Sequence, residues 1–346
     1  SGRCGRPGWV DSHVHLASDL AGVEGLVEGM TRSTAAAAYD AAVNARKTLR
    51  AGFTTVRNPG DGDGVTLALR DAIAAGKIDG PRIVDAGRSI SATTGHMDAT
   101  LGIREDLHPA IDTANLCDGA DDCRRAVRKQ IARGADVIKF ASTGGVNSRI
   151  GAGLGSQMFD DEAKAIVETA HLYGRKVAVH AHGADGIVMA LNAGADSIEH
   201  GTMLDEAGVR AFLNSGAYYV PTLSTVNGYT ERLAANPKAY SGEVLKKIQW
   251  RIGVTGKSLR FAHGRGVKIA FGTDAGVSKH GRNADEFELM VEHGMSPMEA
   301  IVAATVNAAD LLGLADDIGT LEAGKAADLI AVDGDPLQDV RALKQV

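Results

Sequence analysis

The stretch Val10-Asp11-Ser12-His13-Val14-His15 places two histidines at the end of a short apolar run. We predict that this run, residues 8–14, is a β-strand. Because successive side chains of a strand alternate between its two faces, His13 and His15 should point to the same side and reach one metal ion. Alone, such a pair is as often a packing or surface feature as a metal site, so the rest of the chain has to decide.

Further apolar runs alternate with amphipathic stretches along the 346 residues. The predicted strands cover residues 8–14, 54–57, 82–86, 137–141, 177–180, 197–199, 217–221 and 268–272. The predicted helices include residues 34–51, 65–75, 121–133, 160–173 and 243–263. Eight strands with intervening helices favour an α/β fold of the closed (β/α)8 TIM barrel type, for which the chain is long enough. A doubly wound open sheet is the competing arrangement.

The pattern changes after the last predicted helix, residues 296–312. Residues 319–325, GTLEAGK, are expected to form a turn-rich hairpin, and residues 327–332, ADLIAV, a strand. We therefore predict a barrel domain over residues 8–312 and a C-terminal β segment of a small subdomain over residues 313–346. Since almost nothing precedes the first barrel strand, we expect that subdomain to be incomplete or an upstream segment to be missing, which leaves the compartment open.

Composition argues against several classes of partner. The net charge is −6 and no basic stripe occurs, so nucleic acid is not an expected partner. No apolar run reaches the roughly 18 residues that a membrane span needs. Cys4, Cys117 and Cys123 are odd in number and contain no Cys-x-x-Cys pair, which predicts neither a disulfide framework nor a cysteine zinc site. A Cys117–Cys123 bridge is the minor alternative.

Polar residues stand at the carboxyl ends of several predicted strands, the edge where barrel enzymes place their sites. Lys139 lies in the apolar run VIKFA, where an ammonium is costly unless it is neutralised, paired or modified. A desolvated lysine can react with carbon dioxide to give a carbamate that bridges two cations, whereas a buried ion pair is the alternative. The other candidates are His180, His182, His200 and Asp274, and such ligands suit zinc, manganese, cobalt or iron.

Together these segments resemble the amidohydrolase superfamily, and within it the binuclear metallo-dipeptidase and carboxypeptidase branch with its prolidase-like and ochratoxin-type amidohydrolases. The matching segments are HVH at 13–15, Lys139 followed by STGGV at 142–146, VHAHG at 179–183, IEHG at 198–201 and GTDAG at 272–276. The resemblance implies two divalent metal ions, with zinc as the expected metal. The implied ligands are His13, His15 and Asp274 for one ion, His180 and His200 for the other, and carboxylated Lys139 as the bridge.

The expected reaction is hydrolysis of the amide bond of dipeptides or N-acyl-L-amino acids, including N-acyl-phenylalanine amides of the ochratoxin type. A hydroxide that bridges the metals would attack, with Asp274 as general base and then acid, while His182 or His200 helps to polarise the carbonyl. A cyclic amide hydrolase or deaminase of the same superfamily is the alternative, although mononuclear deaminases lack the bridging lysine. A barrel that binds a ligand without turnover is a third reading.

A small-molecule substrate with a free carboxylate needs a binding group. Arg149, in the glycine-rich loop 144–155, could hold that carboxylate as a bidentate fork. His96, His182 and Tyr229 are expected to line the same pocket, and residues 151–155 could act as a lid. Among the remaining histidines, His280 is the strongest further candidate because it follows Asp274 closely. Barrels of this kind often assemble, so we expect a homo-oligomer.

Overall fold

The computed structural model describes residues 3–19, 22–148, 153–240 and 242–346. The strands are β1 (Arg3–Pro7), β2 (Trp9–Asp11), β3 (Phe53–Asn58), β4 (Arg82–Asp85), β5 (Ile138–Ala141), β6 (Val177–Ala181), β7 (Ser197–His200), β8 (Tyr218–Val220) and β9 (Leu329–Asp333). The helices are α1 (Gly22–Thr31), α2 (Thr34–Arg50), α3 (Val65–Ala74), α4 (Ala120–Ala132), α5 (Asp160–Leu172), α6 (Ala184–Ala193), α7 (Glu206–Ser215), α8 (Thr225–Ala235), α9 (Gly242–Val254), α10 (Lys257–His263), α11 (Asp285–Glu292), α12 (Pro297–Val302) and α13 (Ala308–Leu312). Short 3₁₀ segments cover Glu105–Ala110 and Val340–Lys344.

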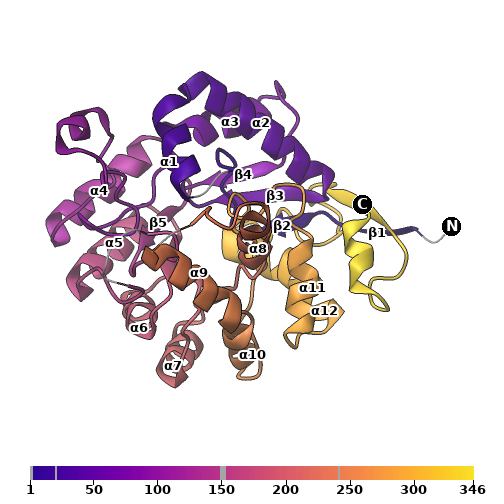
Figure 1. Ribbon diagram of the computed structural model, residues 1–346. Coiled ribbons are helices and arrows are strands. Elements are labelled where there is room, and N and C mark those ends of the chain that lie inside the picture. Colours follow the sequence, from indigo (N-terminus) through magenta and orange to yellow (C-terminus); the bar gives the residue numbers. More distant parts are fainter. Residues whose placement is uncertain (1–2, 20–21, 149–152, 241) are drawn as a thin grey trace.

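The predicted parallel barrel is confirmed. One parallel sheet has the order β2-β3-β4 and a second has the order β5-β6-β7-β8, and helices surround them (Figure 1). An isolated parallel bridge between Ile90 and Phe140 joins β4's side of the barrel to β5. Strands β5 and β6 are buried along their whole length, as strands covered on both faces should be.

The eighth strand, predicted for residues 268–272, forms only an isolated bridge between Tyr219 and Ile269. The segment nevertheless fills the eighth position. The backbone N–H of Tyr219 donates to Lys268 O over 2.8 Å, and the N–H of Ser12 donates to Phe271 O over 2.9 Å. The barrel therefore closes between β8 and β2 through hydrogen bonds that are too few for a regular strand.

Two predicted helices differ from the structure. The helix predicted for residues 243–263 is divided into α9 and α10 at Gly256, whose φ of +75° is left-handed and interrupts a right-handed helix. The last predicted helix, residues 296–312, is α12 and α13 joined by a π-helical turn over Ala303–Asn307. No helix in the described part of the chain combines the length and apolar character that a membrane span requires.

The two ends of the chain meet in a small sheet. Strand β1 pairs antiparallel with β9, from Arg3 opposite Asp333 to Pro7 opposite Leu329 (Figure 1). The expected small β subdomain thus takes strands from both sides of the barrel, two of them within the described ranges. Residues 319–325 form a turn without paired strands, so the expected hairpin is wrong. The division at residues 312 and 313 stays a prediction.

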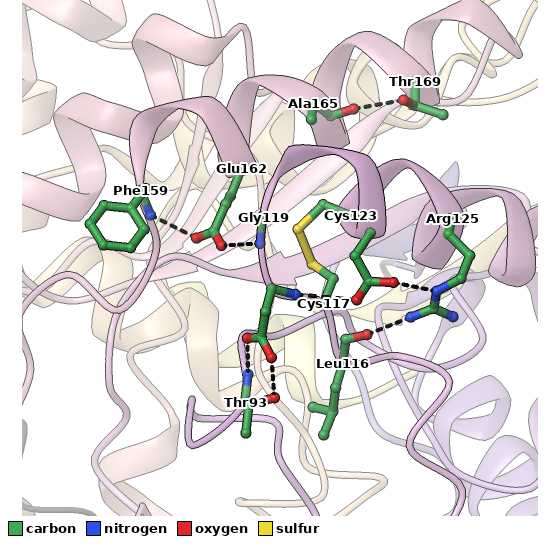
Figure 2. Close-up of a disulfide and its surroundings, with 12 residues drawn as sticks. Thr93, Leu116, Cys117, Gly119, Cys123, Arg125, Phe159, Glu162, Ala165 and Thr169 are labelled. Carbon is green, nitrogen blue, oxygen red and sulfur yellow. Dashed lines mark hydrogen bonds and ion pairs between the residues drawn. A yellow bond between two sulfur atoms is a disulfide. The ribbon is translucent and has the colours of Figure 1, made fainter.

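Cys117 and Cys123 form a disulfide, so the minor alternative of a single bridge between these two residues is the one that the structure has. The bridge links the segment before α4 to the first turns of that helix (Figure 2). Glu162 stabilises the same region, because its carboxylate accepts hydrogen bonds from the backbone N–H groups of Gly119 and Phe159 over 2.6 and 2.9 Å. An odd cysteine count does not exclude a disulfide between two cysteines that lie only six residues apart in the sequence.

Candidate metal centre

A cavity of about 190 Å³ gathers the predicted site residues at the carboxyl ends of the barrel strands. Those that line it are His13, His15, His96, Lys139, His180, His182, His200, Tyr229 and Asp274. Arg149, the predicted carboxylate ligand, lies outside the described residues, as does part of the predicted lid. The pattern of polar residues after apolar strands therefore located one shared cavity.

His13, His15 and Asp274 form the tightest cluster. One potential ligand atom from each lies within 4.8 Å of the others. The Nε2 atoms of His13 and His15 are 3.6 and 3.3 Å from Asp274 Oδ1. Both histidines follow β2 rather than lying in it, and the bridge between Val14 and Ala275 holds them beside Asp274. Two imidazoles and a carboxylate at this spacing can hold one divalent metal ion.

A buried ionic network behind the cluster fixes His13. Glu199 Oε2 lies 2.7 Å from His13 Nδ1, and Glu199 Oε1 accepts from Arg57 Nη2 over 2.7 Å. None of these three side chains is more than 2% exposed. The network orients the ring and leaves its Nε2 toward the cavity. Sequence reasoning missed both partners, although an acidic residue inside the apolar strand SIEH was a readable signal.

Backbone carbonyl groups fix His15 in a similar way. His15 Nδ1 lies 2.6 Å from Gly60 O, which leaves Nε2 for a metal. His280 is buried, and its Nε2 lies 3.0 Å from both His15 O and Ser18 O. His280 therefore supports the segment that carries His15 and does not itself line the cavity.

His180 and His200 form the second group of ligand candidates. Their ring centroids are 4.8 Å apart, and His200 is 5.1 Å from the ring of His13. His200 Nδ1 bonds Thr222 Oγ1 over 2.7 Å, and His180 Nε2 lies 3.3 Å from Gly144 O. Each ring keeps one nitrogen for a ligand, so this pair could hold a second ion next to the first.

Lys139 is 2% exposed and lies in β5 between the two groups. Among the described residues, no carboxylate lies within ion-pair distance of its ammonium, which argues against the buried ion pair considered above. Burial lowers the pKa of Lys139 to about 8, so a sizeable neutral fraction exists near neutral pH. Only the neutral amine reacts with carbon dioxide, and the cavity therefore suits a carbamate.

The charges of the other groups also fit metal binding. Burial lowers the pKa of His13 to about 4 and places the pKa values of His180 and His200 well below the usual range. These imidazoles are neutral at physiological pH, which is the form that binds metals. Burial alone would raise the pKa of Asp274, but His13 and His15 outweigh it and keep the carboxylate ionised.

Backbone strain is concentrated at these residues. His200, Thr222 and Asp274 have φ values of +69°, +47° and +57°, a region that non-glycine residues seldom adopt. Such a conformation costs on the order of 1–3 kcal/mol each and persists only where the surroundings enforce it. Three of the five described non-glycine residues with a positive φ therefore lie at or directly beside the site.

Known proteins resemble this chain over almost its whole length. The sequence pattern of the Amidohydrolase family matches residues 6–346. Ochratoxinase of Aspergillus niger is 34% identical over an alignment of 354 residues, which covers 98% of this chain and 72% of the relative. A Xaa-Pro dipeptidase crystallised with bound methionine in its active site has a TM-score of 0.94 at 41% identity, covering 99% of this chain and 84% of that one.

A prolidase complexed with N-methylphosphonate-L-proline has a TM-score of 0.89 at 31% identity, covering 99% of this chain and 83% of that one. Fold and relatives together define a hydrolase built on a TIM barrel. The chain belongs to the amidohydrolase family, and its similarity to prolidase-like and ochratoxinase structures confirms the predicted resemblance. The relatives support metal-dependent amide hydrolysis as the reaction class.

Proposed function

We propose that this protein hydrolyses the amide bond of dipeptides or N-acyl-L-amino acids with two divalent metal ions, zinc being the expected metal. The observation that carries the proposal is the single cavity that holds both histidine groups, Lys139 and Asp274. His13, His15 and Asp274 would hold one ion, and His180 and His200 the other. Carboxylated Lys139 would supply an anionic oxygen to each.

Bound in this cavity, the metal pair would supply Lewis acidity that activates water and polarises a carbonyl. Asp274 is the base because it is ionised, buried and shared between two histidines. It takes the proton of the attacking water and delivers it to the nitrogen of the leaving amino acid. His200 would act on the carbonyl only through the ion that it holds, because its Nδ1 is bonded to Thr222 Oγ1 and its Nε2 is the one nitrogen left.

His182 is suited to stabilise charge on the carbonyl oxygen. Its Nδ1 lies 2.8 Å from Thr202 Oγ1, and with that hydroxyl as donor the ring hydrogen resides on Nε2. Burial keeps the pKa of His182 well below its usual range, with Arg251 adding to the effect. The ring is therefore a neutral donor that can bond the developing oxyanion.

Other lining residues are proposed to position the substrate. Asn147 Nδ2 donates to Tyr229 Oη over 3.2 Å, which leaves the Tyr229 hydroxyl hydrogen for the substrate. Asn147 Oδ1 is buried and has no partner within the described residues, so it can accept an N–H of the substrate. His96 contacts Ser148 and stacks 4.2 Å from His180, which closes the cavity on that side.

The relatives favour substrates that release a free amino acid. The similar proteins include a Xaa-Pro dipeptidase, a prolidase and an ochratoxinase, and the dipeptidase structure holds methionine in its active site. Among the described residues that line the cavity, Asp274 is the one acidic residue, and as a proposed metal ligand it is not free to pair with a basic side chain. We infer a preference for apolar or aromatic leaving amino acids.

The test is turnover of an Xaa-Phe, Xaa-Pro, Xaa-Arg and N-acyl-Phe panel by protein loaded with zinc or manganese, together with its metal content. We expect two ions per chain and hydrolysis of the Phe and Pro substrates. Asp274→Asn should lower kcat by about 10²–10⁴-fold and retain part of the metal. Normal turnover by a fully loaded Asp274→Asn variant would refute the assigned base. One tightly bound ion per chain would favour the deaminase alternative.

A further inference from the structure

Helix α9 carries two cations and one apolar side chain that contact segments bordering the active-site cavity. Ile248 packs in a cluster with Val146 and Tyr229, both of which line the cavity. Lys247 and Arg251 flank Ile248 along the helix. Helices α8 and α9 lie across the front of the barrel in Figure 1, over the end that holds the site. The inner face of α9 therefore packs directly behind residues of the cavity wall.

Arg251 is a buried cation without an acidic partner. It is 3% exposed, and no carboxylate of the described residues lies within ion-pair distance. Its Nη1 donates to Thr255 Oγ1 over 3.2 Å, and its Nη2 donates to Thr222 O over 3.3 Å. These two long bonds use two of five guanidinium hydrogens. A buried charge left in this state is costly, so a partner from outside the chain would stabilise it.

Lys247, one turn before Arg251 on the same helix, is a second cation that, among the described residues, is bonded to neutral groups only. Its Nζ donates to the carbonyl oxygens of Gly145 and Ser148 over 2.7 Å each, and no described carboxylate lies within ion-pair distance. Between Gly145 and Ser148 lie Val146 and Asn147, two residues of the cavity wall, so the ammonium is anchored to the loop that forms this wall. On the other side, Thr222, whose carbonyl oxygen accepts from Arg251, bonds His200 Nδ1 through its Oγ1 over 2.7 Å, so each cation is anchored to a group beside the site.

We propose that Arg251, assisted by Lys247, binds the free α-carboxylate of the substrate's C-terminal residue. This inference rests on the proposed function and sharpens it, because it restricts the enzyme to the last amide bond of its substrate. A guanidinium is planar and offers two parallel N–H donors, which match the two oxygens of a carboxylate. The carboxylate would supply the ion-pair partner that Arg251 lacks among the described residues.

The experiment compares two substrates that differ only at this group. N-acyl-L-phenylalanine carries the carboxylate, and N-acyl-L-phenylalaninol carries a neutral hydroxymethyl group at the same position. We expect Arg251→Gln to lower kcat/KM for the acid by about 10²–10³-fold, the value of two charge-assisted hydrogen bonds, and to change that for the alcohol by less than about threefold. Lys247→Gln should reduce the preference for the acid less strongly.

Lys246→Gln is the matched control, because Lys246 is exposed on the same helix and pairs with Glu243. It should leave both substrates unaffected. If Arg251→Gln does not fold, Arg251→Lys serves instead. It keeps the charge but not the fork, and should lose part of the preference for the acid. Parallel losses for acid and alcohol would make Arg251 a structural residue, and an intact preference would place the carboxylate elsewhere; either result overturns the proposal.

Binding separates this inference from the proposed function. If the metal-loaded wild type hydrolyses neither substrate, the proposed function fails. Calorimetry with L-phenylalanine and L-phenylalaninol then tests the carboxylate site alone. We expect the wild type to bind the amino acid more tightly than the alcohol, and Arg251→Gln to abolish that difference. Equal binding of both ligands by the wild type would overturn the inference.

Discussion

Replacement of Glu199 by glutamine should weaken both the fold and the metal centre. Glu199 is fully buried and joins His13 Nδ1 to Arg57 Nη2, over 2.7 Å on each side. Glutamine keeps the shape but leaves the Arg57 guanidinium uncompensated, and breaking a buried pair in this way costs about 3–5 kcal/mol. The orientation of His13 is lost as well, and such a change lowers metal affinity by about 10–100-fold.

Two measurements check this prediction. Urea unfolding gives the loss of unfolding free energy, and competition with a chelator gives the affinity of the metal site. Glu243→Gln is the control, because Glu243 and its partner Lys246 are exposed and solvent screens their attraction, so this change should leave the unfolding free energy nearly unaltered. If Glu199→Gln retained wild-type metal affinity, the role of Glu199 in orienting His13 would be refuted. Wild-type unfolding free energy would refute the buried ion pair as a source of stability.

Three further predictions concern other parts of the chain. Protein equilibrated with ¹³C-bicarbonate should show a carbamate signal by NMR that Lys139→Met lacks; the same signal in both would place the carbamate elsewhere. Burial raises the pKa of Glu286 from 4.5 to about 7, so its protonated form favours the folded state and the unfolding free energy should fall as pH rises through this window. Glu286→Gln should flatten that decline in urea titrations, and an unchanged slope would contradict the assignment. Cys123→Ser should lower the unfolding free energy by about 2 kcal/mol, because the cross-link no longer restricts a short loop of the unfolded chain. An unchanged unfolding free energy in calorimetry would show that the bridge is dispensable.

Local patterns were enough to predict the ligand candidates. Each of His180, His200 and Lys139 interrupts an apolar run at a strand, and parallel strands of a barrel end at one edge. The sequence therefore predicts both the fold and the shared cavity. Arg57 and Glu199 escaped because they are 142 residues apart, and no local pattern reports that two charged residues will meet in a core.

The remaining misses have local causes. The chain turns at Asp274, where φ is +57°, and the segment before it makes too few hydrogen bonds with β8 and β2 to form a regular strand. Apolar patterning does not reveal that turn. The interruption at Gly256 was more accessible, since glycine within a long helix is a recognised stop signal. Arg251 was not considered because an arginine on an amphipathic helix is ordinarily solvent-exposed.

The barrel's closing seam has a consequence for folding. At this seam, the segment 268–275 bonds β2 and the residues that follow it. Strand β1, just before β2, pairs with β9. In both contacts more than 250 residues of sequence separate the two segments. Contacts of such long range form late, after the loop entropy of the whole barrel has been overcome. His13 and His15 come from one side of the seam and Asp274 from the other. A metal ion held by all three would stabilise the closed seam by linking its two sides. Removal of the metal should therefore speed amide hydrogen exchange first along this seam.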